Sequence, residues 1–579
     1  MVSPWHFGNT TVRNPSRIRD GLIVLNESTL HGNLIGKKEQ ALFAKELDKA
    51  GVINLGKQAD FFGRKWRSCF YQLGFITHKF TKALKSSEFD PVIGEVMKSN
   101  PSLELSGLPF DITPSGLRMI KAESIHEQQE CMLRSLLAYE IPSIIEPKNG
   151  DTVFKPFIFI LQVLKGITAI DNSKGLSKVE MGIIQTYRNH TEVKNAIEEI
   201  LRYRNKRNSV VGRVPKRKTD KEMLIKLGEA SGVQSSTIND YADVNFRYSR
   251  FTGLLSYQGK RLIIKDDKLP VVNDILEGFS VVDTRLNDQD YLAYLWKGAS
   301  LPTDNAVKAV KEIRRFKELL LDSGVNYSLL PQIPDTDDVA ELNQIRLRLE
   351  VLYQQVLEKQ FAANQLNEDQ ILETIAYLKK IDHQHVDLNV EIDDPPAYLE
   401  WAVWRAFLSI NNLVNEPHEA RRFKVDQDFF PVNCAPGGGP DLIFEFDEYV
   451  LVVEVTLTTS SRQEAAEGEP VRRHVAKEKA RISELVDKPV YGLFIARSID
   501  NNTAETFRIG VWYNKDVPDF INIVPITLKQ FISFMEKYQV EKFDNSTFRQ
   551  LLDMCLIPRN AHAPAWKSEI DKVFKQILS

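Results

Sequence analysis

The stretch PDLIFEFDEYVLVVEVTLT (440–458) decides the fold of the C-terminal part of this 579-residue chain. Two apolar runs, 441–446 and 449–458, flank the turn-forming pair Asp447-Glu448, so they predict two adjacent strands joined by a tight turn. The second run is apolar on both faces, as in a strand buried between two layers. It contains one carboxylate, Glu454, and burying an ionised carboxylate is costly unless a partner compensates its charge.

The elements around this hairpin predict an α/β domain. An apolar helix at 397–413 carries Glu400, and a glycine-rich turn (APGGG) precedes Asp441. A charged helix at 471–485 and strands at 490–496 and 521–527 follow, which completes the order helix, strand, strand, helix, strand. The glycine-rich turn lacks the Gly-Lys-Ser/Thr sequence of a P-loop, so nucleoside triphosphate binding is not expected.

Asp441 and Glu454 are expected to converge at one end of the sheet, because one opens the first strand and the other lies within its neighbour. Two convergent carboxylates suit Mg²⁺, which keeps several waters and binds substrate phosphates. Such an ion activates water for phosphodiester hydrolysis. The simpler interpretation of Glu454 alone is a salt bridge to a basic neighbour.

The near-neutral net charge of −3 hides two oppositely charged regions. Residues 201–265 contain 15 Lys/Arg against 5 Asp/Glu, a charge of +10, whereas residues 391–470 contain 5 against 16, a charge of −11. The basic region suits a polyanion such as DNA. The acidic region suits a polyanion only when bound cations offset its charge, which again indicates a metal.

The first region, 1–120, predicts a winged-helix-like DNA-recognition subdomain. Helical periodicity at 39–50 is followed by a helix rich in aromatic and basic residues at 60–73 and by a short hydrophobic strand at 74–77. The candidate DNA contacts are Arg64, Lys65 and Arg67. The alternative is a small helical domain on which these three residues are solvated.

The second region, 121–300, predicts another winged-helix-like subdomain. Amphipathic helices at 175–187 and 196–207 precede a basic loop, VGRVPKRKTD (211–220), and a further helix. The segment 246–266 then reads as a basic helix end leading into a two-stranded wing, with a turn at Gln258-Gly259. Its expected phosphate contacts are Arg213, Lys216, Arg217, Lys218, Arg247 and Arg250, although a solvated loop explains Lys216–Lys218 almost as well.

Residues 301–390 predict a helical linker between recognition and cleavage. Two charged helical segments are separated by SGVNYSLLPQIPDTDD, whose prolines break the helix. Asp393-Asp394-Pro395-Pro396 marks the boundary before a last domain, 391–579. The chain starts without the basic and apolar segments of a signal peptide and has no bilayer-length apolar run, which predicts an intracellular protein without a membrane partner.

Several motifs together resemble the AlwI/PleI family of type IIS restriction endonucleases and the related strand-specific nicking endonucleases. Pro440-Asp441, thirteen residues later Glu454-Val455-Thr456, resembles the PD-(D/E)xK nuclease motif. The phrases WHFGNTTVRNPSR (5–17), AYLEWAVW (397–404) and Glu-x-Glu-Pro-Val-x-Arg-His (467–474) extend the resemblance over nearly the whole chain. It implies a multidomain α+β protein with N-terminal winged-helix recognition domains, a helical linker and a C-terminal α/β nuclease domain. It also implies cleavage a few base pairs from a short asymmetric site.

Carried over by position, the resemblance gives the site residues. Asp441, Glu454 and Glu400 become carboxylate ligands of Mg²⁺, with the backbone carbonyl of Val455 as a further ligand. Glu467 and His474 fall on the family's other catalytic positions. Thr456 replaces the lysine of the general motif, so the positive charge must come from elsewhere. His474 and Lys477, three residues apart on one helix, are the candidates.

One such site cuts one strand, so a double-strand break requires a second copy, by transient homodimerisation or from a small nuclease subunit. The first alternative is therefore a strand-specific nickase or the large subunit of a heterodimeric enzyme. The second is a winged-helix DNA-binding regulator that retains an inactive nuclease fold.

Overall fold

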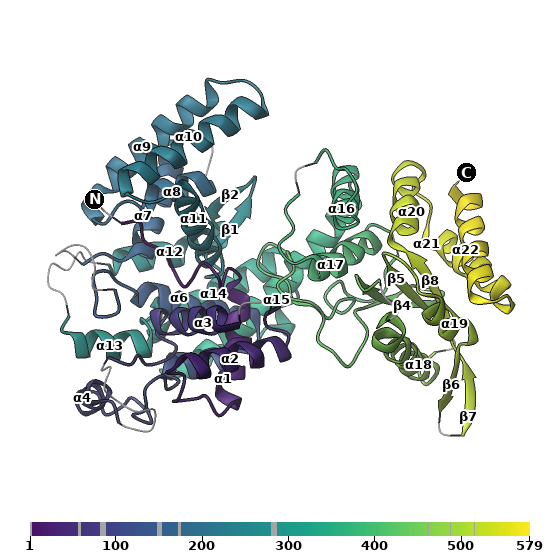
Figure 1. Cartoon of the computed structure of the whole chain (residues 1–579), viewed down its shortest axis with the longest axis horizontal. Helices are drawn as coiled ribbons and strands as arrows, with labels where there is room; N and C mark the ends of the chain where they lie inside the picture. The colour runs from purple at the N-terminus through teal and green to yellow at the C-terminus, as the bar shows by residue number, and fades with distance from the viewer. Residues whose placement is uncertain are drawn as a thin grey trace. The chain divides into compact units, whose positions relative to one another are not determined.

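The computed structural model describes residues 3–55, 59–80, 89–146, 153–171, 175–279, 286–388, 390–410, 412–459, 462–486, 488–514 and 516–578. The chain forms two compact units, the first of residues 1–318 and 326–349 and the second of residues 319–325 and 350–579 (Figure 1). The described residues are mostly helical and form three small sheets. None of the described helices combines the length and apolar character that crossing a bilayer requires.

The first unit is built from helices and one hairpin. The helices are α1 (Ile18–Glu27), α2 (Lys37–Lys49), α3 (Ala59–Gln72), α4 (Pro91–Ser99), α5 (Pro114–Lys121), α6 (Ile125–Ala138), α7 (Pro156–Ile170), α8 (Lys178–Ile184), α9 (Val193–Asn208), α10 (Arg213–Ser231), α11 (Ser235–Arg250), α12 (Leu269–Glu277) and α13 (Asp288–Lys297). The hairpin pairs β1 (Leu255–Gln258) with β2 (Arg261–Ile264). The helices α14 (Ala306–Asp322) and α15 (Val339–Asn364) continue into the second unit.

One hydrophobic core runs through the two regions that the sequence suggests as separate subdomains. It contains Trp5 and Phe7 from the N-terminal segment, Phe70 from α3, Phe157 from α7 and Tyr248 from α11. Tyr248 donates its hydroxyl hydrogen to the carbonyl of Val12. The residues on both sides of position 120 are therefore packed as one body.

The predicted wing after α11 is confirmed as a hairpin. Its two turn residues, Gly259 and Lys260, have φ values of 56° and 64°, the conformation that a two-residue type I′ turn requires. The turn thus lies one residue later than the sequence suggests. In the described part of region 1–120 the predicted strand after α3 forms only a single bridge, Ile76 to Ile112, and no second hairpin is seen.

The predicted basic loop at 211–220 is wrong, because Arg213–Asp220 form the first turns of α10. Pro215 suggested a loop, yet proline is tolerated in the first turn, where backbone N–H groups have no partner within the helix. The helix ends at Gly232, whose left-handed φ of 68° suits a glycine cap.

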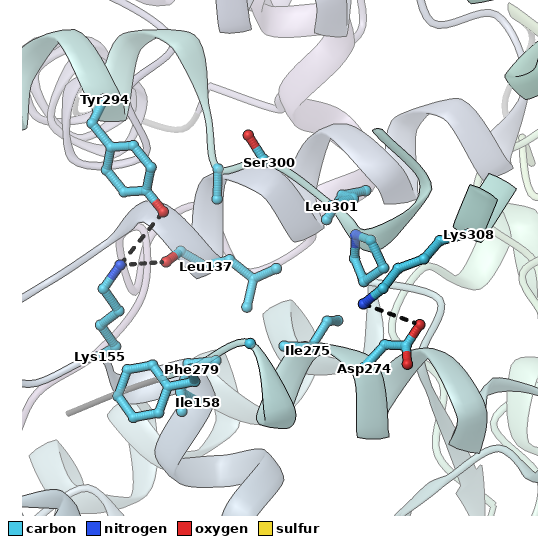
Figure 2. Close-up of a pocket in the computed structure, with 13 residues that line it drawn as sticks. Leu137, Lys155, Ile158, Asp274, Ile275, Phe279, Tyr294, Ser300, Leu301 and Lys308 are labelled. Carbon is cyan, nitrogen blue, oxygen red and sulfur yellow. Dashed lines mark hydrogen bonds and ion pairs between the residues drawn. The ribbon is translucent and has the colours of Figure 1, made fainter. Parts of the chain in front are cut away.

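A pocket of about 280 Å³ lies in the first unit and is lined by both apolar and charged side chains. The Lys155 ammonium donates to the carbonyl of Leu137 at 3.3 Å and to the Tyr294 hydroxyl at 3.5 Å, while Lys308 lies 3.5 Å from Asp274 (Figure 2). Burial lowers the pKa of Lys155. Since both ammonium groups already face protein acceptors, this pocket is not our candidate active site.

The second unit contains a four-stranded sheet in the order β3-β4-β5-β8, formed by β3 (Leu442–Glu445), β4 (Val450–Thr456), β5 (Val490–Ala496) and β8 (Asn522–Thr527). The pair β3–β4 is antiparallel, and β4–β5 and β5–β8 are parallel. Because β5 is buried along its whole length, helices cover both faces. In Figure 1, α17 (Pro395–Leu408) and α18 (Glu469–Ser483) lie on different sides of β4 and β5.

The remaining elements complete this unit. They are α16 (Glu368–Ile381), the π-helical turn η6 (Glu464–Gly468), α19 (Asn501–Ile509), the hairpin of β6 (Val511–Asn514) and β7 (Val517–Phe520), α20 (Leu528–Glu541), α21 (Asn545–Leu556) and α22 (Ala563–Leu578). The predicted strands and the helices at 397–413 and 471–485 are confirmed to within a few residues, and the hairpin β6–β7 is an element that the sequence did not suggest. Helix α16, expected in a linker, packs against α17 and α20.

Candidate active site

Asp441 and Glu454 lie side by side at one end of the sheet. In the antiparallel pair, Leu442 faces Val453, so the next position along the ladder sets Asp441 opposite Glu454. Directly opposed residues of neighbouring strands project from the same face. The convergence predicted from the sequence is therefore present.

A third side chain joins this row from the segment 420–422. Arg421 forms an antiparallel bridge with Leu442, and the Arg422 N–H donates to the carbonyl of Asp441 at 3.3 Å. The same register places Arg422 opposite Asp441. The row across the sheet is thus Arg422, Asp441 and Glu454, and the next strand adds Phe494 beside Glu454.

The two carboxylates resist ionisation. Burial, and next the charge of Glu454, raise the pKa of Asp441 well above its ordinary value, although the Val455 N–H donates to Asp441 Oδ2 at 2.9 Å. Burial and the charge of Glu467 raise the pKa of Glu454 to about 8, against hydrogen bonding from Asp441 and the charge of Arg422. Two anions this close need a cation between them to be ionised together.

Glu400 faces the same pair from α17. Its Oε2 accepts the Ala435 N–H at 2.7 Å, and its carboxyl also hydrogen-bonds with Cys434. Burial and the charge of Asp441 raise the pKa of Glu400 to about 9. The glycine-rich turn and the helix therefore bring a third carboxyl group to the site.

His474 and Glu467 flank Glu454 from the segment after β4. His474 Nδ1 lies 2.6 Å from Glu454 Oε1, while no described residue gives the buried Nε2 atom a partner. Burial, with the charges of Arg473 and Arg422, lowers the pKa of His474 to about 4. Glu467, on η6, hydrogen-bonds with the Thr456 side chain, and burial raises its pKa. A π-helical turn often marks a functional position, but nothing in the sequence indicates one here.

The two candidates for the missing positive charge are placed differently. His474 is buried, and its low pKa keeps the imidazole neutral near pH 7. Lys477, also on α18, is exposed. The cation whose charge acts on both Asp441 and Glu454 is Arg422, which the sequence analysis missed. Its only signal was its basic character within an acidic region.

The carboxyl groups suit a divalent cation. Within the described residues, no three His, Cys, Asp or Glu side chains are already arranged as a metal site. However, Glu400, Asp441, Glu454 and Glu467 all have raised pKa values, so the negative charge at the site exceeds what the protein's own cations offset. Hard carboxylate oxygens with an uncompensated charge are the donors that Mg²⁺ takes.

The predicted DNA contacts on α3 differ in their surroundings. Arg67 Nη1 donates to the carbonyls of Leu34 and Ile35, both at 2.9 Å, and the guanidinium lies 4.8 Å from the centre of the Phe110 ring. Arg64 and Lys65 lie over the exposed ring of Phe61. Arg64 and Lys65 are therefore better placed for a ligand than Arg67.

The predicted contacts of the second region fall on α10 and α11. Arg213, Arg217 and Lys218 are exposed on α10, and Lys216 is half-buried there. On α11, Arg247 pairs with Asp243 at 2.8 Å, and Arg250 lies 5.5 Å from the centre of the Tyr257 ring of the wing. The start of α10 is thus the most exposed basic group of this region.

Comparison with known proteins identifies one family. The family model of the AlwI restriction endonuclease matches residues 71–534, whereas none of the curated proteins matches. Among solved structures, the crystal structure of the small subunit, R.BspD6I2, of the heterodimeric restriction endonuclease R.BspD6I is similar at 21% identity. That similarity covers 35% of this chain and 98% of the subunit, with a TM-score of 0.28. Because the family match takes in most of the chain, the protein belongs to the AlwI restriction endonuclease family, and is accordingly a type II restriction endonuclease, a site-specific deoxyribonuclease.

Proposed function

We propose that the protein is a type IIS endonuclease that binds a short asymmetric DNA site and cleaves a phosphodiester a few base pairs downstream. The observation that carries this proposal is the row of Asp441 and Glu454 at the end of the sheet, with Glu400 beside them and raised pKa values throughout. The order α17, β3, β4, α18, β5 agrees with the PD-(D/E)xK nuclease core that the sequence resembles. The proposed metal ligands are all residues of the second unit.

Asp441 and Glu454 would hold Mg²⁺, with Glu400 and the backbone carbonyl of Val455 as further ligands. When bound, the ion lowers the pKa of a water and offsets the charge of the reacting phosphate. The Val455 N–H orients Asp441, and His474 Nδ1 orients Glu454. In the reaction, the water gives up a proton as its oxygen bonds to phosphorus, one ester P–O bond breaks, and the leaving oxygen takes up a proton.

Recognition is assigned to the first unit. We propose that α10, α11 and the β1–β2 wing act as a winged helix, and that α2 and α3 form a second DNA-contacting helix pair. Separate units for recognition and cleavage suit cutting outside the bound site. A nickase, or the large subunit of a heterodimeric enzyme, is the alternative, because the second unit carries one such carboxylate row.

A plasmid assay tests this function. With Mg²⁺ and supercoiled plasmid, the wild type is expected to give open circles, and linear DNA only if a second copy or a small subunit supplies another site. Asp441→Asn and Glu454→Gln are expected to reduce cleavage by at least about 1000-fold while DNA binding persists. Specific binding by the wild type without cleavage in Mg²⁺ or Mn²⁺ would instead support the regulator, and undiminished cleavage by both variants would refute the site.

The cut position gives the second readout. Run-off sequencing of the nicked product is expected to show a fixed offset from one asymmetric site. Cleavage within the site, or at random positions, would contradict the type IIS assignment.

A further inference from the structure

We propose that Arg422 binds the scissile phosphate and supplies the positive charge that Thr456 cannot provide. The inference rests on the proposed nuclease function and adds a catalytic residue to it. The geometry of the segment 420–422, the glycine-rich turn and the carboxylate row carries it.

The position of Arg422 is fixed by the backbone. Its N–H donates to the Asp441 carbonyl at 3.3 Å, and the neighbouring Ile443 N–H donates to the Ala420 carbonyl at 3.0 Å. These two bonds hold the segment 420–422 antiparallel to the start of β3. As a result, the Arg422 side chain projects from the face that carries Asp441 and Glu454.

The guanidinium group of Arg422 contacts the glycine-rich turn. Arg422 Nη1 donates to the carbonyl of Pro440 at 3.3 Å. A Cβ atom added to Gly439 would lie 2.4 Å from Nη1 and 2.7 Å from Cζ of Arg422. Because these distances are too short for real contacts, the residue at 439 must lack a side chain for the guanidinium to occupy this position.

No carboxylate of the described residues forms an ion pair with Arg422. Among the described residues, no carboxylate lies within 4 Å of its guanidinium, although the charge of Arg422 acts on Asp441, Glu454 and His474. The adjacent Arg421 contrasts with it, since Nε and Nη2 of Arg421 both bind Glu358. Arg422 therefore keeps most of its five N–H donors for a ligand, and it is only half-buried.

A phosphate is the ligand that fits this arrangement. A guanidinium presents a planar fork to two oxygens of one phosphate, and it stays charged at every working pH. Held beside the metal-binding carboxylates, it would meet the same phosphate that the metal contacts. It would then stabilise the additional negative charge on the phosphate oxygens in the transition state, as the lysine of the general motif does.

The test uses the full-length protein and the rate of first-strand cleavage under single-turnover conditions with Mg²⁺. Arg422→Gln is expected to slow cleavage by about 100–1000-fold, with DNA affinity changed only a few-fold, because one donor set for the transition state is lost. The matched control is Arg549→Gln, which removes a surface arginine that pairs with Glu448 at the other end of the β3–β4 hairpin. Its rate should stay within about two-fold of the wild type.

A rescue separates charge from structure. Thr456→Lys introduced into Arg422→Gln returns a cation to the site from a different strand, so it is expected to recover at least about tenfold of the lost rate. Free guanidinium, compared with NaCl at equal ionic strength, is expected to do the same for Arg422→Ala. Neither rescue would repair a turn that had merely lost its hydrogen bond to Pro440.

A second variant, Gly439→Ala, tests the same inference if Arg422→Gln does not fold. Gly439→Ala leaves Arg422 in the chain but displaces its guanidinium, the flexible end of the side chain, at little cost in stability. It should slow cleavage at least about tenfold, whereas Gly437→Ala, which meets nothing within 4 Å, should not.

Each result of these experiments either supports or overturns the role of Arg422. The inference is supported if Arg422→Gln slows cleavage and either rescue reverses the loss. If Arg422→Gln is unfolded, slowed cleavage in Gly439→Ala supports the inference by itself. The inference is overturned, while the nuclease function stands, if Arg422→Gln cleaves within about three-fold of the wild-type rate, or if neither rescue restores its activity. If Arg422→Gln is unfolded, a rate within about three-fold of the wild type in Gly439→Ala overturns it. A wild type that cuts nothing overturns both.

Discussion

The Glu454 carboxyl group lies where ionisation is costly. Burial deprives the carboxylate of solvation by water, and the nearby charge of Glu467 opposes a second negative charge. Together they raise the pKa of Glu454 to about 8, although hydrogen bonding from Asp441 and the charge of Arg422 act in the opposite direction. The metal-free site therefore costs the fold stability whenever the pH ionises it.

The stability of the metal-free protein should consequently fall as the pH rises. The unfolded chain loses the Glu454 proton near the ordinary glutamate pKa of 4.5, whereas the folded protein keeps it up to about 8. Stability thus declines between these two values. At pH 8.5 without metal, Glu454→Gln is expected to unfold at a higher temperature than the wild type, by about 2–4 °C for each kcal/mol of ionisation cost removed.

Thermal unfolding at pH 5 and pH 8.5 measures this effect. Glu448→Gln is the control, because Glu448 is exposed and pairs with Arg549 away from the site. An equal pH dependence in wild type and Glu454→Gln would show that ionising Glu454 does not destabilise the fold.

At the scale of elements, the basic N-terminal turns of α10 are the clearest candidate contact with DNA. A helix N-terminus carries a partial positive charge, to which Arg213, Lys216, Arg217 and Lys218 add their own. Both favour a phosphate at this end of the helix. By contrast, Lys206 on α9 and Lys226 in the later part of α10 already pair with Glu222 and Glu199, respectively.

Replacing Arg213, Lys216, Arg217 and Lys218 with glutamine should weaken DNA binding without affecting sequence preference. The dependence of log K on log salt should become shallower by about 0.9 for each phosphate contact removed. Replacing Lys206 and Lys226 instead should leave the slope nearly unchanged. Fluorescence anisotropy over a range of salt concentrations measures both, and an unchanged slope in the fourfold variant would exclude α10 from the interface.

The sequence predicted the elements with strong periodicity and missed those that depend on local geometry. The strands around Glu454 are apolar enough to identify, and their tight turn fixes the register that brings Asp441 alongside. The helical start at Arg213 was missed because Pro215 and Gly212 suggest a loop. Arg422 was missed because its role depends on pairing with β3, twenty residues later, and a sequence pattern does not show such pairing.

At the scale of the whole molecule, the chain is two bodies with separate cores. The first core draws on residues from Trp5 to Leu301, and the second on residues from Ile371 to Phe574. The proposed metal ligands all belong to the second. Unfolding is therefore not a single two-state transition.

Calorimetry should accordingly resolve two transitions, of which Mg²⁺ shifts one. An ion at 100 times its dissociation constant stabilises the body that binds it by about 2.7 kcal/mol. Asp441→Asn should abolish that shift and leave the other transition in place. Movement of both transitions by Mg²⁺ in the wild type, or a shift that persists in Asp441→Asn, would contradict a single metal site in the second unit.

The alignment of Arg422, Asp441 and Glu454 across neighbouring strands also limits how this enzyme can change over evolutionary time. Side chains alternate between faces along a strand, so inserting or deleting one residue in the β3–β4 turn can shift the pairing and send Glu454 to the opposite face from Asp441. Length variants in this region are therefore expected to be lost from natural populations. Diversification should proceed by substitutions, and by exchange of the unit to which we assign recognition.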